Sequence, residues 1–190
     1  MPIAASVLSV ADSPKISDRR LLALYEYWLD LGEAAGGLPL LTAFDALRVR
    51  TLLPNIWIVE VDDETHRFRM RLAGEDINVV YGRNIGGHFF ADLFDPLDLP
   101  TILARYTRAL RDPSIFFAKG AVYAAAGRRT LGERLGVPML GRGGGTSILL
   151  GATVYGGRIN ETTPVMISGD VAEFIPVQAA NHKPVEIAGA

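Results

Sequence analysis

The sequence predicts an α+β protein: a five-stranded antiparallel sheet with helices on one face, preceded by an amphipathic helix. Two observations lead to this prediction. Strand-like segments come first as a pair and later as a group of three, and helical segments lie between the two groups. Within each group, polar or glycine-containing turns join the neighbouring strands, as they do in hairpins.

The first helix is predicted over residues 18–35, because apolar side chains recur there at helical spacing. Ser17 is the predicted N-cap, and a pair of glycines ends the helix. The apolar stripe of this helix consists of Leu21, Leu24, Tyr25, Trp28 and Leu31. It must be buried, either against the sheet of the same chain or against a partner. Residues 1–16 are expected to be a flexible arm, and residues 17–43 hold the helix and a linker.

A hairpin follows the second predicted helix, residues 44–53, which Pro54 stops. The first strand is the β-branched run at 56–61, and the second strand is residues 66–73. Side chains of the second strand alternate between two faces. One face carries Phe68, Met70 and Leu72, and the other carries Arg67, Arg69 and Arg71. A short helix is then predicted over residues 75–81.

The second half of the chain contains a predicted helix over residues 95–111 and then three strands. These strands are residues 115–125, 128–140 and 146–155. The first of them is apolar except for Lys119, which fits a strand buried on both faces. The glycine-rich run at 141–145 lacks the Lys-Ser/Thr ending of a phosphate-binding loop, so it predicts a hairpin turn. Residues 157–190 have no sustained period and are expected to be a mostly flexible tail.

Three short motifs carry a family resemblance. They are Leu52-Leu53-Pro54 before the first strand, Arg71-Leu72-Ala73-Gly74 at the end of the second, and Tyr81-Gly82 with Gly87 after the short helix. With these motifs the chain resembles the PAS domain superfamily, in particular short bacterial proteins that are little more than one PAS domain. The resemblance places the domain at residues 44–156. It implies a sensor fold whose helices cover one face of the sheet.

Composition excludes several classes of protein. The formal net charge of -2 gives no basic face of the kind that nucleic-acid binding needs. Without cysteine, the chain has no disulfide and no cysteine metal site, which fits a reducing cytoplasm. No apolar window is long enough for a membrane span, and the N-terminus does not resemble a signal peptide. The sequence therefore predicts a cytoplasmic protein that binds neither nucleic acid nor membrane.

The resemblance implies that a small apolar ligand would lie between the helices and one face of the sheet. Aromatic residues gather in the helical region, and apolar residues of the strands are expected to face them. The candidate ligand-binding residues are Phe68, Met70, Leu72, Tyr81, His88, Phe89, Phe90, Phe94, Tyr106, Phe117, Glu133 and Met139. The same side chains also fit a filled core, and the sequence leaves both interpretations open.

The sequence predicts no catalytic residue, no metal site and no cofactor. The three histidines lie far apart in the chain. His88, beside Phe89 and Phe90, is the one placed where some PAS domains hold a haem ligand. We nevertheless expect that neither haem nor flavin copurifies. A flavin–cysteine photosensor is excluded because there is no cysteine.

Two charged features stand out. Glu133 falls in phase with apolar neighbours of its strand, so it must be paired or its pKa must rise. It fits a polar anchor for a ligand, a partner for an arginine, or a bulge residue turned outward. The arginine stripe of the second strand fits either an anion site or cross-strand pairing, for example with Glu60.

These expectations combine into a stand-alone PAS-type sensory or regulatory module that acts in signal transduction by contacting an unidentified protein. The apolar stripe of the first helix predicts a homodimer with Leu21, Leu24, Tyr25, Trp28 and Leu31 at or near the interface. One alternative is a small enzyme that uses Glu133 or His88 as a base. The other is a structural interaction protein with a filled core.

Overall fold

The computed structural model describes residues 8–125, 128–158 and 171–188. Its strands form one antiparallel sheet in the order β1-β7-β4-β5-β6-β2-β3. The strands are β1 (Ser9–Val10), β2 (Ile56–Val61), β3 (Phe68–Ala73), β4 (Ser114–Ala125), β5 (Arg128–Met139), β6 (Ile148–Arg158) and β7 (Val171–Gln178). The five predicted strands are confirmed as β2 to β6, and β7 and β1 extend the sheet beyond β4 to seven strands.

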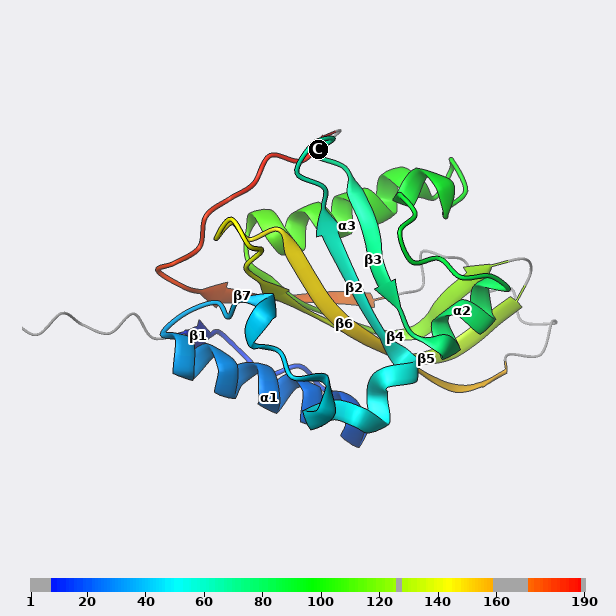
Figure 1. Cartoon of the computed structure of the whole chain (residues 1–190). Helices are drawn as coiled ribbons and strands as arrows, with labels where there is room; N and C mark the ends of the chain where they lie inside the picture. The colour runs from blue at the N-terminus through cyan, green and yellow to red at the C-terminus, as the bar shows by residue number, and fades with distance from the viewer. Residues whose placement is uncertain (1–7, 126–127, 159–170, 189–190) are drawn as a thin grey trace, which may run out of the picture.

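Helices cover both faces of this sheet, with α1 on one side and α3 on the other (Figure 1). The helices are α1 (Arg19–Ala35), α2 (Glu75–Tyr81) and α3 (Leu99–Arg111), and the 3-10 turns are η1 (Leu41–Ala43), η2 (Ala46–Asn55) and η3 (Phe90–Asp92). We call the α1 side, which carries Ile58 and Phe117, the outer face. The side of α2 and α3, which carries Trp57 and Phe116, is the inner face. Among the described residues, none of the helices has the length and hydrophobicity of a membrane span.

The N-cap of the first helix lies one residue later than predicted. Asp18, not Ser17, is the N-cap, and its Oδ1 accepts a hydrogen bond of 2.8 Å from the N–H of Arg20. The helix ends at Gly36, whose φ of 64° is the left-handed conformation that glycine adopts readily. The second predicted helix is the 3-10 segment η2, which is broken at Val49.

The apolar stripe of α1 is buried in its own chain. Leu21 and Leu24 are completely buried on the outer face, and Tyr25, Trp28 and the half-buried Leu31 pack in the same layer. The indole N–H of Trp28 donates a hydrogen bond of 3.1 Å to the carbonyl of Pro138. The sheet beneath α1 covers this stripe within the single chain, which is one of the two packings predicted for it, and a dimer interface at or near these residues stays a prediction.

The predicted register of β3 is confirmed for Phe68 and Met70, which are buried on the inner face. It is wrong for Leu72. Ile58 pairs with Leu72 whereas the next residue of β2 pairs with Met70, so Arg71 is the extra residue of a β-bulge. The bulge turns Leu72 to the side of Ile58, where it is 44% exposed.

Phe117 and Met139 also lie on the opposite face from the one predicted. Both are buried in the outer layer, and Phe116 takes the inner position on β4. On β4 the apolar residues occupy both alternating sets of positions, because this strand is covered on both faces, so its pattern does not tell which set faces α3. On β5 the apolar set that includes Met139 is predicted to lie on the inner face, but it packs in the layer under α1.

The prediction of a mostly flexible C-terminal tail is wrong for residues 171–188. Strand β7 pairs with β4 along its length, and Ile175 and Val177 are buried. Ser9 and Val10 of the predicted arm pair with β7 in turn. Beyond β7, the side chain of Ile187 is buried, and the N–H of Ala188 donates to the carbonyl of His66. Residues 1–7 and 159–170 lie outside the described part of the chain.

Candidate functional site

Aromatic rings occupy the inner layer between the sheet and α3. The ring of Phe90 lies 5.4 Å from Phe68, 5.2 Å from Phe94 and 4.9 Å from Tyr106, measured between ring centroids. Tyr81 extends the group through an edge contact with Phe94 at 6.4 Å. Five candidate residues of the predicted pocket are thus brought together, in the geometry that packed aromatic side chains prefer.

The sheet closes this layer from below with two large side chains. Tyr106 lies 6.0 Å from the ring of Trp57 and 6.1 Å from that of Phe116. The indole N–H of Trp57 is satisfied inside the protein, since it donates to the hydroxyl of Thr153 at 3.0 Å. The contacts between these rings favour the filled-core interpretation of the inner layer over a wide preformed pocket.

Two candidates of the inner pocket make their contacts elsewhere. The ring of Phe89 lies under the guanidinium of Arg67, 4.6 Å from its centroid, in a cation–π contact. His88 is half-buried, and its Nδ1 lies 3.2 Å from the carbonyl oxygen of Gly86. Among the described residues there is no cluster of three metal-ligating side chains.

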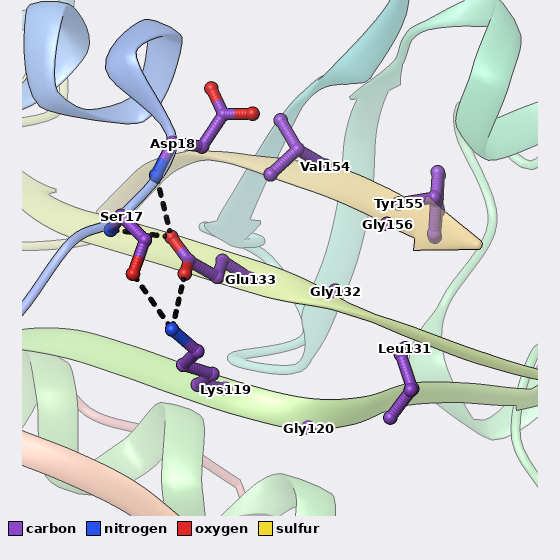
Figure 2. A pocket seen from close by; sticks show the side chains of 10 residues that line it. All are labelled: Ser17, Asp18, Lys119, Gly120, Leu131, Gly132, Glu133, Val154, Tyr155 and Gly156. Carbon is purple, nitrogen blue, oxygen red and sulfur yellow. Dashed lines mark hydrogen bonds and ion pairs between the residues drawn. The ribbon is translucent and has the colours of Figure 1, made fainter.

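Glu133 makes several polar contacts on the outer face of the sheet. Its Oε2 accepts hydrogen bonds from the backbone N–H groups of Ser17 at 2.9 Å and Asp18 at 3.0 Å. Its Oε1 lies 3.0 Å from the ammonium of Lys119 on β4, which also donates to the Ser17 hydroxyl at 2.7 Å. Figure 2 shows these contacts between the start of α1 and the sheet. The side chain of Glu133 is 9% exposed.

The environment of Glu133 keeps it ionised. Burial on its own would raise the pKa of this carboxyl group. The hydrogen bonds from the Asp18 and Ser17 backbone and from Lys119 outweigh burial, so the pKa lies below its usual value. Of the three predicted roles, the structure shows the paired carboxylate. Its partners are Lys119 and two backbone N–H groups instead of an arginine.

A cleft of about 430 Å³ opens beside this contact on the outer face, next to the first turn of α1 (Figure 2). Its described lining residues are Ser17, Asp18, Lys119, Gly120, Leu131, Gly132, Glu133, Val154, Tyr155 and Gly156. The cleft is hollow because glycines from three adjacent strands meet there. Gly120 pairs with Gly132 across β4 and β5, and Gly156 is the extra residue of a bulge in β6.

Lys119 belongs to this cleft, and sequence analysis did not select it. The signal was present, because Lys119 is the only charged residue of β4 and Glu133 is the only acidic residue of β5. The register pairs them directly. Two such charges on neighbouring strands predict a cross-strand ion pair once the strands are aligned.

The arginine stripe is accounted for by pairing within the sheet. Arg69 and Arg71 both bind the carboxylate of Glu60 on β2, with a distance of 3.0 Å from Arg71 Nη1 to Glu60 Oε2. Arg69 also lies 3.5 Å from Asp62. The expected cross-strand partner Glu60 is thus confirmed. The guanidinium groups are partly exposed, so these pairs contribute little to stability.

Comparison with protein-family models identifies a family for this chain. A family model described as a PAS domain covers residues 16–154, which is most of the chain. The search of curated proteins found no match, and the search of solved structures found none either. The matched region begins immediately before α1, so it includes both the helix on the outer face and the sheet.

Proposed function

Since this chain belongs to the PAS domain family, we propose that it is a sensory or regulatory module of signal transduction. A small apolar ligand or a partner protein would change the packing on one face of the sheet, and the strands would pass this change to α1. The output would be a contact with another signalling protein in the cytoplasm. Pairing of two chains stays part of this proposal, with the interface near the buried stripe of α1.

The observation that carries the proposal is that consecutive residues of one strand belong to opposite layers. On β2, Trp57 contacts Tyr106 in the inner layer, and its neighbour Ile58 is part of the outer layer. On β4, Phe116 and Phe117 divide in the same way. Packed layers do not deform independently when they share a backbone. A ring that shifts on the inner face must therefore move a side chain under α1.

The helix α1 is suited to report such a shift, because polar contacts fix it to β5, the strand that pairs with β4. Glu133 of β5 holds the two residues before the helix, and the carbonyl of Pro138, also in β5, accepts from Trp28. A displacement of β5 would have to lengthen or re-aim these hydrogen bonds. The start of α1 is the part of the helix that would respond.

The proposed role is regulatory and not enzymatic, which agrees with the chemistry of the candidate bases. Glu133 accepts several hydrogen bonds and has a lowered pKa, so it is a poor proton acceptor near neutral pH. The structure brings no histidine to its side in the described cleft. Both features favour a binding module over the enzyme alternative.

Hydrogen exchange tests the proposal. Tyr106→Leu removes the ring that touches Trp57 and Phe116 but leaves the outer face unchanged in sequence. We expect faster exchange of the amides in the first two turns of α1, measured by mass spectrometry or NMR. Amides that exchange through local opening are the informative ones, because global destabilisation does not alter local opening.

Leu97→Ala is the matched control. Leu97 is 89% exposed and precedes α3, so its loss should leave exchange in α1 as in the wild type. The proposal is contradicted if Tyr106→Leu changes exchange in α3 and the inner strands while α1 keeps its wild-type rates. In that case the two layers are independent, and a signal on the inner face does not reach the helix.

A further inference from the structure

We propose that the glycine-floored cleft on the outer face is a binding site for a small, uncharged, mainly apolar molecule that carries one carbonyl or hydroxyl group. The inference rests on the proposed regulatory function and adds the place and class of the ligand. The inner layer, where a ligand is expected by resemblance, is occupied by rings in mutual contact. The cleft beside α1 offers about 430 Å³, within the range of small-molecule sites.

The walls of the cleft are apolar and accessible. Leu131 is 50% exposed and faces the cleft together with Val154, so a ligand would cover apolar surface that is now wet. Gly156 leaves real space, since a Cβ built on it would meet its nearest neighbour, the carbonyl oxygen of Leu131, at 3.7 Å. A glycine inside a strand often marks a bulge or the close approach of a ligand, and the bulge at Gly156 leaves room for such an approach. The bound molecule would be that close approach.

One polar group at the edge of the cleft can recognise the ligand. The ammonium of Lys119 has three N–H donors, and described partners use two of them, the Ser17 hydroxyl and Glu133 Oε1. The remaining donor is available to an acceptor in the cleft, because the Lys119 side chain is 58% exposed. The ligand therefore needs a single hydrogen-bond acceptor attached to an apolar body.

The charged side chains around the cleft disfavour an anionic ligand. The positive charge of Lys119 is already balanced by Glu133, 3.0 Å away, and the Asp18 carboxylate is bound by Arg20. A second carboxylate on Lys119 would lie close to the ionised Glu133 and be repelled. A neutral carbonyl or hydroxyl forms the same hydrogen bond without this cost.

Binding would bear on regulation because the cleft lies between two parts of the fold. Ser17 and Asp18 lead into α1, whereas the glycine floor belongs to β4, β5 and β6. A molecule between them would add contacts across the junction that Glu133 now maintains. We expect it to tighten the start of α1 on the sheet.

The test uses 1-octanol as the probe and octanoate as its charged counterpart, each titrated into the full-length, ¹⁵N-labelled protein. We expect octanol to shift the backbone amide signals of Gly120, Gly132 and Gly156 saturably, and octanoate to bind several-fold more weakly. Gly156→Leu fills the cleft and should weaken octanol binding by at least about tenfold. Gly143→Leu is the control. Gly143 lies in the turn between β5 and β6, where the same added side chain would meet open space.

Lys119→Met provides a second variant in case Gly156→Leu folds poorly. Lys119 is exposed, and Glu133 keeps its two backbone donors, so this variant should fold and bind octanol several-fold more weakly. The site is overturned if octanol gives no saturable shifts at the three glycines, or if neither variant changes its affinity. Equal affinity for octanoate would overturn the ligand class.

Exchange in α1 separates failure of the site from failure of the proposed function. Slower exchange at the start of α1 on octanol binding supports both. Saturable binding with unchanged exchange in α1 keeps the site and contradicts the regulatory role. A response of α1 to Tyr106→Leu without octanol binding keeps the regulatory role and overturns the site.

Discussion

The inner face is held mainly by contacts between aromatic rings. The outer face is richer in aliphatic side chains, although Tyr25, Trp28 and Phe117 also belong to it, and it has polar contacts at both ends of α1. At the start of the helix, Glu133 binds the backbone of Ser17 and Asp18. Beyond its end, the side-chain amide of Asn181 binds both the N–H and the carbonyl of Leu38, at 2.8 and 2.9 Å. In the inner layer, the indole N–H of Trp57 donates a hydrogen bond to the hydroxyl of Thr153.

This difference has consequences for motion. Aliphatic contacts are non-directional, and aromatic rings pack favourably in more than one arrangement, so the inner layer can shift by small amounts with little loss of free energy. Hydrogen bonds are directional and weaken when their geometry changes. The outer face is therefore the one on which a small movement of the strands has a defined effect, at the ends of α1.

The largest effect is expected from deletion of β7, because this strand contributes side chains to both faces of the sheet. A chain truncated after Gly157 lacks β7, which places Ile175 and Val177 in the outer layer and Phe174 beside the inner one. It also lacks Ile187. Burial of each aliphatic side chain contributes about 1.5–3 kcal/mol, so the sum approaches the whole stability of a domain, about 5–15 kcal/mol. We expect no cooperative thermal transition by circular dichroism.

A truncated chain that melts within a few degrees of the full protein would contradict this account of β7. A chain that ends after Gln178 is the informative comparison. It keeps the strand and loses only the segment with Asn181 and Ile187, so it should fold with reduced stability.

The next largest effect is expected in the inner layer. Phe90→Ala removes a ring that is 1% exposed and touches three other rings. The cavity and the lost contacts should lower the free energy of unfolding by about 3–5 kcal/mol. Urea denaturation measures this change. Val79→Ala on the exposed side of α2 is the control and should change stability by less than about 0.5 kcal/mol. A loss below that value for Phe90→Ala would mean that the inner layer is not packed as described.

The polar anchor of the outer face should have a smaller effect. Glu133→Gln keeps the shape but replaces one acceptor oxygen by a donor and removes the charge that faces Lys119. Hydrogen bonds to charged groups are each worth about 1.5–3 kcal/mol, and we expect a loss in that range by urea denaturation. The exposed Glu64→Gln in the hairpin turn serves as the control. Equal stability of both variants would show that α1 does not depend on this anchor.

The smallest expected effect is a change in pH dependence. The pKa of Glu133 is lowered in the folded protein, so its contribution is present above the unfolded pKa of about 4.3 and is lost as pH falls through the folded pKa. Stability of the wild type should therefore fall in acid more steeply than that of Glu133→Gln. Asp18, whose pKa is lowered by Arg20, keeps part of the dependence in both proteins. Parallel stability curves from pH 7 to 3 would contradict the assignment.

The sequence was sufficient for the core of the fold because β2, β3 and α2 have clear periods and clear ends. Residues 75–81 were predicted as a helix and are α2. The faces of β4 could not be assigned, since its apolar residues occupy both alternating sets of positions. On β5 one apolar set is clear, but the sequence does not tell whether α1 or α3 covers it. The bulge at Arg71 could not be seen either, because a single extra residue leaves the local composition unchanged.

The candidate site was predicted in part for the same physical reasons. The contact between Phe90 and Tyr106 follows from an aromatic cluster on helices that pack on one face. The place of Glu133 beside α1 depends on which face of β5 the helix covers, which is a tertiary property. The strand β7 was missed because Pro176 and the lack of a regular period hide it, although β4 and β1 lie on either side of it.

The central claim is that the two faces of the sheet are coupled, and a double-mutant cycle tests it most directly. Tyr106→Leu perturbs the inner layer and Leu24→Ala perturbs the outer layer, and the two side chains lie on opposite sides of the sheet. Free energies of unfolding are measured for the wild type, both single variants and the double variant. We predict an interaction energy of at least about 1 kcal/mol, whereas independent sites add to within about 0.3–0.5 kcal/mol. Additivity within that limit would contradict coupling and, with it, the proposed route from the inner face to α1.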